Sequence, residues 1–79
     1  MTTLVFSLTV LAKDDFGPHY VNHTVAASNV SEAEQIVTAF YASGAEELIE
    51  FDQAVILDDV RADGRPRILE TLGKVYFEE

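Results

Sequence analysis

The segment HYVNHTVAASNVSEAEQIVTAF, residues 19–40, decides the fold because a strand pattern is followed directly by a helix pattern. β-Branched and aromatic residues are frequent over residues 19–27, as is typical of a strand. Ser31 then precedes Glu34 by three residues, which is the spacing of a capping box. The apolar residues after it recur at i, i+3, i+4 and i+7: Ala33, Ile36, Val37 and Phe40. We therefore predict a strand over 19–27 and a helix over 32–43.

Strand patterns also flank this segment. Apolar alternation predicts a first strand over residues 3–12, joined to the second by a turn-rich loop. A third strand begins at Glu47. Its odd positions are apolar and its even positions include acids, which indicates one wet face. The Asp63-Gly64 turn signal leads to a fourth strand over 68–77, with a bulge near Gly73. The predicted fold is a single α+β domain over residues 1–79, ββαββ, with two hairpins joined by a helix that covers one face of an antiparallel sheet.

The charge of the chain is concentrated in its middle. No lysine or arginine lies between Asp14 and Val60, and the formal net charge is −9. The acids of this segment are Asp14, Asp15, Glu32, Glu34, Glu46, Glu47, Glu50, Asp52, Asp58 and Asp59. Such a field repels nucleic acid and anionic membranes but speeds encounter with positively charged proteins. The predicted partner is therefore a basic protein surface, with no direct binding of nucleic acid or membrane.

The predicted partner-binding residues are the acids of the third strand and those of the first loop, together with an aromatic residue in that loop. They are Asp14, Asp15, Phe16, Glu46, Glu47, Glu50, Asp52, Asp58 and Asp59. On the wet face, Leu48, Ala54 and Ile56 would form an apolar centre rimmed by charge, as in an interface. An ordinary solvated sheet face has the same pattern. Phe16 is either a protruding anchor or a plug for the open end of the sheet, and both interpretations stay open.

Other constellations favour structure over chemistry. Glu32 and Glu34 suit the first turn of a helix through its dipole, and Arg61, Arg65 and Arg67 have acids close in sequence to pair with. His19 and His23 have metal-ligand chemistry, but residues four apart in a strand are separated by about 13 Å, too far for one ion. No nucleophile elbow, phosphate loop or paired-carboxylate cleft is recognisable. We expect no metal, no cofactor and no enzymatic activity.

The chain resembles small phage-encoded inhibitors, in particular the anti-CRISPR proteins that block multisubunit type I surveillance complexes. The resemblance rests on a short, cysteine-free, acidic chain and on a strand, Val25-Ala26-Ala27-Ser28, that runs into a helix opened by Ser31-Glu32-Ala33 and continued by Ile36. It implies a cytoplasmic, non-enzymatic inhibitor in a bacterial host cell that occupies a Lys/Arg-rich DNA-recognition surface of the effector. The absence of cysteine fits that reducing compartment.

DNA mimicry is a narrower form of this hypothesis. Over the third strand the acids give one charge per about 7 Å, against about 3.4 Å along one DNA strand. Mimicry would therefore require the acids of the 14–15 loop and of the helix start to join the same surface. The alternative hypothesis is a small structural or assembly protein, homodimeric through an exposed sheet edge. A third, a metal or small-molecule sensor, would use the histidines and the 14–15 acids.

Overall fold

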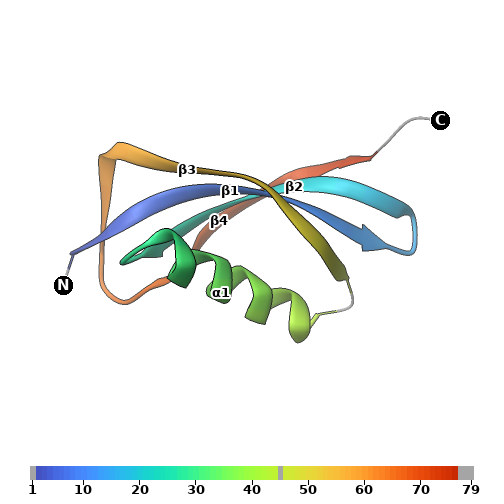
Figure 1. The fold of residues 1–79 in the computed structure, drawn as a ribbon, viewed down its shortest axis with the longest axis horizontal. Helices are drawn as coiled ribbons and strands as arrows, with labels where there is room; N and C mark the ends of the chain where they lie inside the picture. Colours follow the sequence, from blue (N-terminus) through green and yellow to red (C-terminus); the bar gives the residue numbers. More distant parts are fainter. Residues whose placement is uncertain (1, 45, 77–79) are drawn as a thin grey trace.

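The part of the chain that the structure describes forms one antiparallel sheet with one helix against it (Figure 1). The computed structural model describes residues 2–44 and 46–76. Its elements are β1 (Thr2–Asp14), β2 (Gly17–Ala27), α1 (Val30–Ala42), β3 (Glu47–Asp63) and β4 (Arg67–Tyr76). The α+β class and the order of elements are confirmed. Phe77, the predicted end of the fourth strand, lies outside the described residues.

The strand order is β3-β1-β2-β4, so β3 and β4 lie at opposite edges of the sheet. The prediction of a second hairpin is therefore wrong. The Asp63-Gly64 signal does mark a bend, where Gly64 has a φ of 96°, but a bend does not determine which strand lies beyond it. β3 pairs with β1, and the chain then crosses the end of the sheet to pair β4 with β2. In Figure 1 this crossing lies at the end where β1 begins.

The core lies between α1 and one face of the sheet. Alternate residues of β1 and β2 point to this face because side chains alternate along a strand. The buried cluster is Phe6, Leu8, Val10, Ala12, Val21, Val25, Ala27, Ala33, Val37 and Tyr41. Full burial of a Val or Leu side chain contributes about 1.5–3 kcal/mol. No helix covers the opposite face among the described residues, although Val5 and Ala26, which pair on that face, are fully buried.

The helix starts at a different cap from the one predicted. The N-cap is Asn29, whose Oδ1 accepts from the Glu32 backbone N–H at 2.8 Å. The Glu32 carboxylate accepts in return from the Ser28 backbone N–H at 2.7 Å. Asn29 and Glu32 have the same three-residue spacing as Ser31 and Glu34. The predicted capping box therefore lies two residues C-terminal to the observed one.

The buried face of the helix also differs from the prediction. Ala33, Val37 and Tyr41 follow i, i+4 and i+8 and are buried. Tyr41, outside the predicted apolar row, is 6% exposed, whereas Phe40, inside that row, is 48% exposed. Phe40 and Tyr41 are both aromatic, so the spacing of apolar residues alone could not show which of them is buried, and it favoured Phe40.

Two irregularities in the β1–β3 pairing overturn the predicted faces of β3. The register shifts between Thr9 and Val10 and again between Leu11 and Ala12. An extra residue in a strand moves every side chain beyond it to the other face. Leu48, Phe51, Ala54 and Ile56 consequently pair with Ala12, Val10, Leu8 and Phe6, which face the helix. Glu50, Gln53 and Val55 share the open face instead, so the predicted apolar centre rimmed by acids on the wet face is wrong.

The bulge predicted near Gly73 is confirmed. Tyr20 and Asn22, two residues apart on β2, pair with Val75 and Leu72, which are three residues apart on β4. The extra length lies in the Gly73 region. A second register shift lies where Thr24 and Val25 pair with Glu70 and Ile68, and the two together explain why neither parity of apolar residues fits the whole strand.

Candidate protein-binding surface

The acids of β3 line an exposed edge of the sheet. Glu47, Glu50, Asp52, Asp58 and Asp59 are all exposed on this outermost strand. The ion pairs found within residues 2–44 and 46–76 involve other carboxylates, those of Asp14 and Glu46. We call these five residues the acidic edge. Their charges remain available to a partner.

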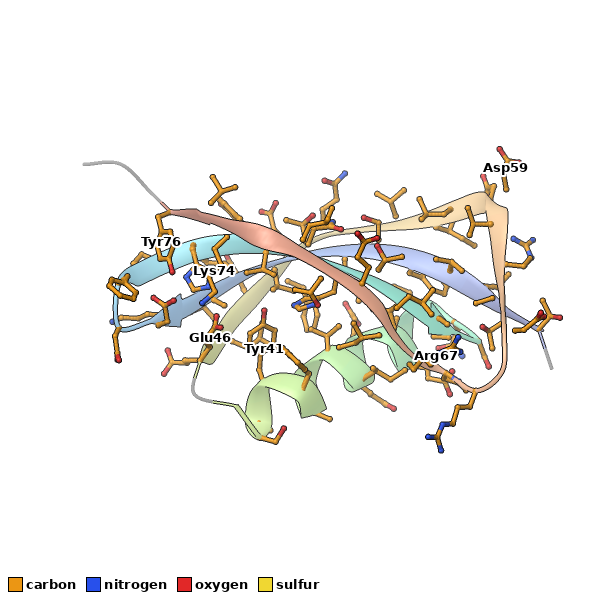
Figure 2. The ribbon with its side chains drawn as sticks, turned by 180° about the vertical axis from the view of Figure 1, so that it is seen from behind. Tyr41, Glu46, Asp59, Arg67, Lys74 and Tyr76 are labelled. Atoms are coloured by element: carbon orange, nitrogen blue, oxygen red, sulfur yellow. The ribbon has the colours of Figure 1, made fainter. Side chains whose placement is uncertain are left out.

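The acidic edge runs along the length of the molecule. Glu47 is the register partner of Lys13, next to the β1–β2 turn. Asp59 lies at the bend of β3, at the opposite end from Tyr76 and Lys74 (Figure 2). The molecule measures 43 Å along its longest axis. Five charges over a strand of this length are too widely spaced to reproduce the phosphates of a DNA strand.

The β1–β2 turn presents an aromatic side chain beside one end of this edge. Asp14 Oδ1 accepts from the Phe16 backbone N–H at 2.8 Å, and Gly17 follows with a φ of 112°. The left-handed conformation at Gly17 suits glycine, which has no Cβ. Phe16 is 86% exposed. Its ring makes an edge-to-face contact with the ring of Tyr76. Its side chain therefore protrudes and does not plug the sheet.

Two of the predicted partner-binding acids are already paired inside the molecule. Lys74 Nζ lies 2.8 Å from Asp14 Oδ2 and 3.0 Å from Glu46 Oε2. Tyr76 donates its hydroxyl to Asp14 Oδ2 at 2.6 Å, and His19 Nε2 lies 2.8 Å from Glu46 Oε1. We call these five residues the tip cluster; Figure 2 labels three of them, Glu46, Lys74 and Tyr76. Because Lys74 is bonded to both carboxylates, Asp14 and Glu46 are less available to an outside partner than the acids of the acidic edge.

Asp14, Glu46 and Lys74 of the tip cluster are ionised at neutral pH. Hydrogen bonds from Lys74 and Tyr76 hold the pKa of Asp14 well below its usual value. Burial would raise the pKa of Glu46, but hydrogen bonds from Lys74 and His19 outweigh it and the pKa is lowered. The two carboxylates in turn raise the pKa of Lys74. The cluster thus ties β1, β4 and the segment before β3 together.

Side chains of the metal-binding type converge within the tip cluster. Ligand atoms of Asp14, His19 and Glu46 lie within 4.8 Å of one another. Sequence reasoning paired His19 with His23 and missed Glu46, which is 27 residues away from His19. The Lys74 ammonium, however, is bonded to both carboxylates where a cation would sit. Lys74 thus occupies the place of a cation in a structural cluster, and we do not assign a metal to it.

The second histidine belongs to the core. His23 is fully buried, with Nδ1 at 2.9 Å from the Thr71 hydroxyl and Nε2 at 2.7 Å from the Tyr41 hydroxyl. Burial lowers the pKa of His23 and raises the pKa of Tyr41 to about 12. Both groups are therefore neutral at neutral pH and act in packing.

The arginines near the bend bond to backbone oxygens. Arg61 donates to the carbonyls of Asp58 and Val60, both at 2.9 Å. Arg67 similarly donates at 2.9 Å to two carbonyls of the bend, those of Asp63 and Arg65. The predicted pairing of these guanidinium groups with nearby carboxylates is replaced by carbonyl capping, which leaves the Asp58 carboxylate in the acidic edge.

No protein-family model, curated protein or solved structure matches this chain. Within the described residues, no helix has the length and apolar character needed to cross a membrane. The functional interpretation therefore depends on the acidic edge and the turn beside it.

Proposed function

We propose that the protein is a non-enzymatic, anti-CRISPR-like inhibitor in the cytoplasm of a bacterial host cell that uses its acidic edge to bind a basic DNA-recognition surface. The intended target is a nucleic-acid-handling complex such as a type I CRISPR effector. One observation carries the proposal: the acidic edge retains its exposed carboxylates while Asp14 and Glu46 are bonded to Lys74 inside the molecule. A Lys/Arg-rich surface is the complement of such an edge.

The turn beside the edge supplies a second contact. Phe16 is exposed and its backbone is fixed by Asp14, so little conformational entropy would be lost when a partner buries the ring. Exposed aromatic residues that become buried often dominate interface energetics. Asp15 directly precedes it in sequence, and Glu47 pairs with Lys13, three residues before Phe16. This end of the acidic edge is our candidate for the centre of the interface.

The proposal does not include mimicry of duplex DNA. Two of the acids that would have to join the β3 acids are used elsewhere: Asp14 binds Lys74, and Glu32 caps the helix at Ser28. The acidic edge would act as one strand of charge that attracts a basic surface. Binding should accordingly weaken with salt, because exposed charges are screened beyond about 8–10 Å at physiological ionic strength.

The test is competition with DNA for a purified type I effector complex. Labelled target DNA is bound to the complex, and the protein is titrated in at low salt. We expect the protein to displace the DNA at a saturating stoichiometry, without cleavage or modification of either component. Undiminished DNA binding at protein concentrations far above that of the complex would contradict the choice of target.

A second candidate function, a structural or assembly role as a homodimer, is favoured by the other edge of the sheet. β4 exposes Leu69, Leu72 and Val75, and its Arg67, Glu70 and Lys74 give it a formal charge of +1, from two bases and one acid. Two copies could meet there without the repulsion that two acidic edges would suffer. Sedimentation equilibrium at micromolar concentration separates the two candidates. A dimer lost in Leu72→Glu favours assembly, and a monomer removes that candidate.

A further inference from the structure

The two buried histidines face different kinds of partner. Both ring nitrogens of His23 meet hydroxyl groups, which can donate or accept, so a neutral ring satisfies both. His19 Nδ1 instead lies 3.1 Å from the Gly17 carbonyl oxygen, and His19 Nε2 lies 2.8 Å from Glu46 Oε1. A carbonyl and an ionised carboxylate can only accept. Both nitrogens of His19 must therefore donate.

The ionised state of Glu46 follows from its other contact. Glu46 Oε2 lies 3.0 Å from Lys74 Nζ, whose ammonium only donates. A neutral His19 ring would set one nitrogen lone pair against an oxygen. His19 is 0% exposed, so water cannot separate the two atoms. Such a contact is costly in a buried site, and a second proton on the ring removes the conflict.

We propose that His19 is an imidazolium at neutral pH and that its second proton locks the β1–β2 turn. The groups facing it are Asp14 of β1, at 3.9 Å from Nδ1, Glu46 before β3, and Tyr76 of β4, whose ring centroid lies 4.8 Å away. Lys74, bonded to Asp14 and Glu46, adds a second positive charge. With His19 charged, the tip cluster contains two cations and two anions. It is electrically neutral.

Loss of that proton would release the turn. The neutral ring keeps its shorter bond to Glu46 and gives up the bond from Nδ1 to the Gly17 carbonyl. Gly17 directly follows Phe16, so the turn would gain freedom as the pH rises. The charge state of His19 is independent of the proposed function. An effect of the freed turn on partner binding through Phe16 would rest on the proposed function.

The test uses the ring nitrogen resonances of both histidines in the folded protein. Long-range nitrogen–proton NMR spectra at neutral pH should show two protonated nitrogens for His19, and one protonated and one bare nitrogen for His23, the internal control. Raising the pH should remove one His19 proton and shift the Phe16 and Gly17 amide signals together. A neutral His19 tautomer at neutral pH would overturn the proposal without affecting the acidic edge.

Glu46→Gln tests the same assignment through the acceptor. The amide can accept or donate, so the second proton on His19 should be lost at neutral pH and amide exchange at Gly17 should accelerate. Glu47→Gln is the matched control, since it removes the neighbouring exposed charge and should leave the His19 spectrum unchanged. An unchanged His19 spectrum in Glu46→Gln contradicts the proposal. If that variant does not fold, the spectrum of the unsubstituted protein decides alone.

Discussion

Tyr41→Phe removes one oxygen from the core and nothing else. The Tyr41 hydroxyl lies 2.7 Å from His23 Nε2, and phenylalanine preserves the ring contacts with Phe40 and His23. The change leaves a nitrogen of a fully buried ring without its partner. An unsatisfied buried polar group costs about 1–3 kcal/mol. For a domain of this size each kcal/mol lowers Tm by about 4–8 °C, so we expect a fall of about 4–24 °C.

The assay is thermal and urea unfolding followed by circular dichroism, with Tyr76→Phe as the matched control. Tyr76 donates to Asp14 on the exposed side of the tip cluster, where water and Lys74 can still satisfy the carboxylate. The same atom is deleted, but the shift in Tm should be much smaller. Equal shifts for the two variants, or an unchanged Tm for Tyr41→Phe, would refute the idea that this pair is a buried link between α1 and β2.

Three further predictions test the helix and the core. Asn29→Ala should cost about 0.5–2 kcal/mol as loss of an N-cap, whereas Ser31→Ala should be nearly neutral in urea unfolding; the reverse order would contradict the cap assignment. Leu8→Ala should cost about 2–5 kcal/mol, and Phe40→Ala clearly less because Phe40 is half exposed; similar values in thermal unfolding would place Phe40 in the core. Burial lowers the pKa of His23 below 6.5, so its contribution to the free energy of unfolding is present above pH 6.5 and is lost as the pH falls. An NMR titration midpoint for His23 at or above that of an unfolded peptide would contradict this.

The elements themselves could be predicted because local patterns encode them. Alternation over β1 and helical spacing over α1 depend on neighbours within a few residues. The helix register could not be chosen from spacing alone, because Asn29 and Ser31 are both good caps and Phe40 and Tyr41 are both apolar. The contacts of α1 with the sheet select Tyr41.

The sheet order and the tip cluster depend on contacts that are distant in sequence. Asp14 and Lys74 are 60 residues apart, and no local signal pairs them. The acidity of β3 could be predicted from its residue types. That Leu48 and Ala54 lie on the helix-facing side, away from Glu50, depends on the register shifts in the pairing with β1. The sequence therefore predicts that the surface is acidic better than it predicts which residues make up that surface.

Charge reversal on the acidic edge tests the central claim most directly. Binding to a purified type I effector complex would be measured for the unsubstituted protein, for Glu50→Lys with Asp52→Lys, and for Glu70→Lys on the opposite edge, each at low and physiological salt. We expect salt to weaken binding of the unsubstituted protein. The β3 double variant should weaken it by about tenfold or more at low salt, and Glu70→Lys much less, with all three proteins folded. Equal affinities for the two variants, or binding that ignores salt, would contradict the account.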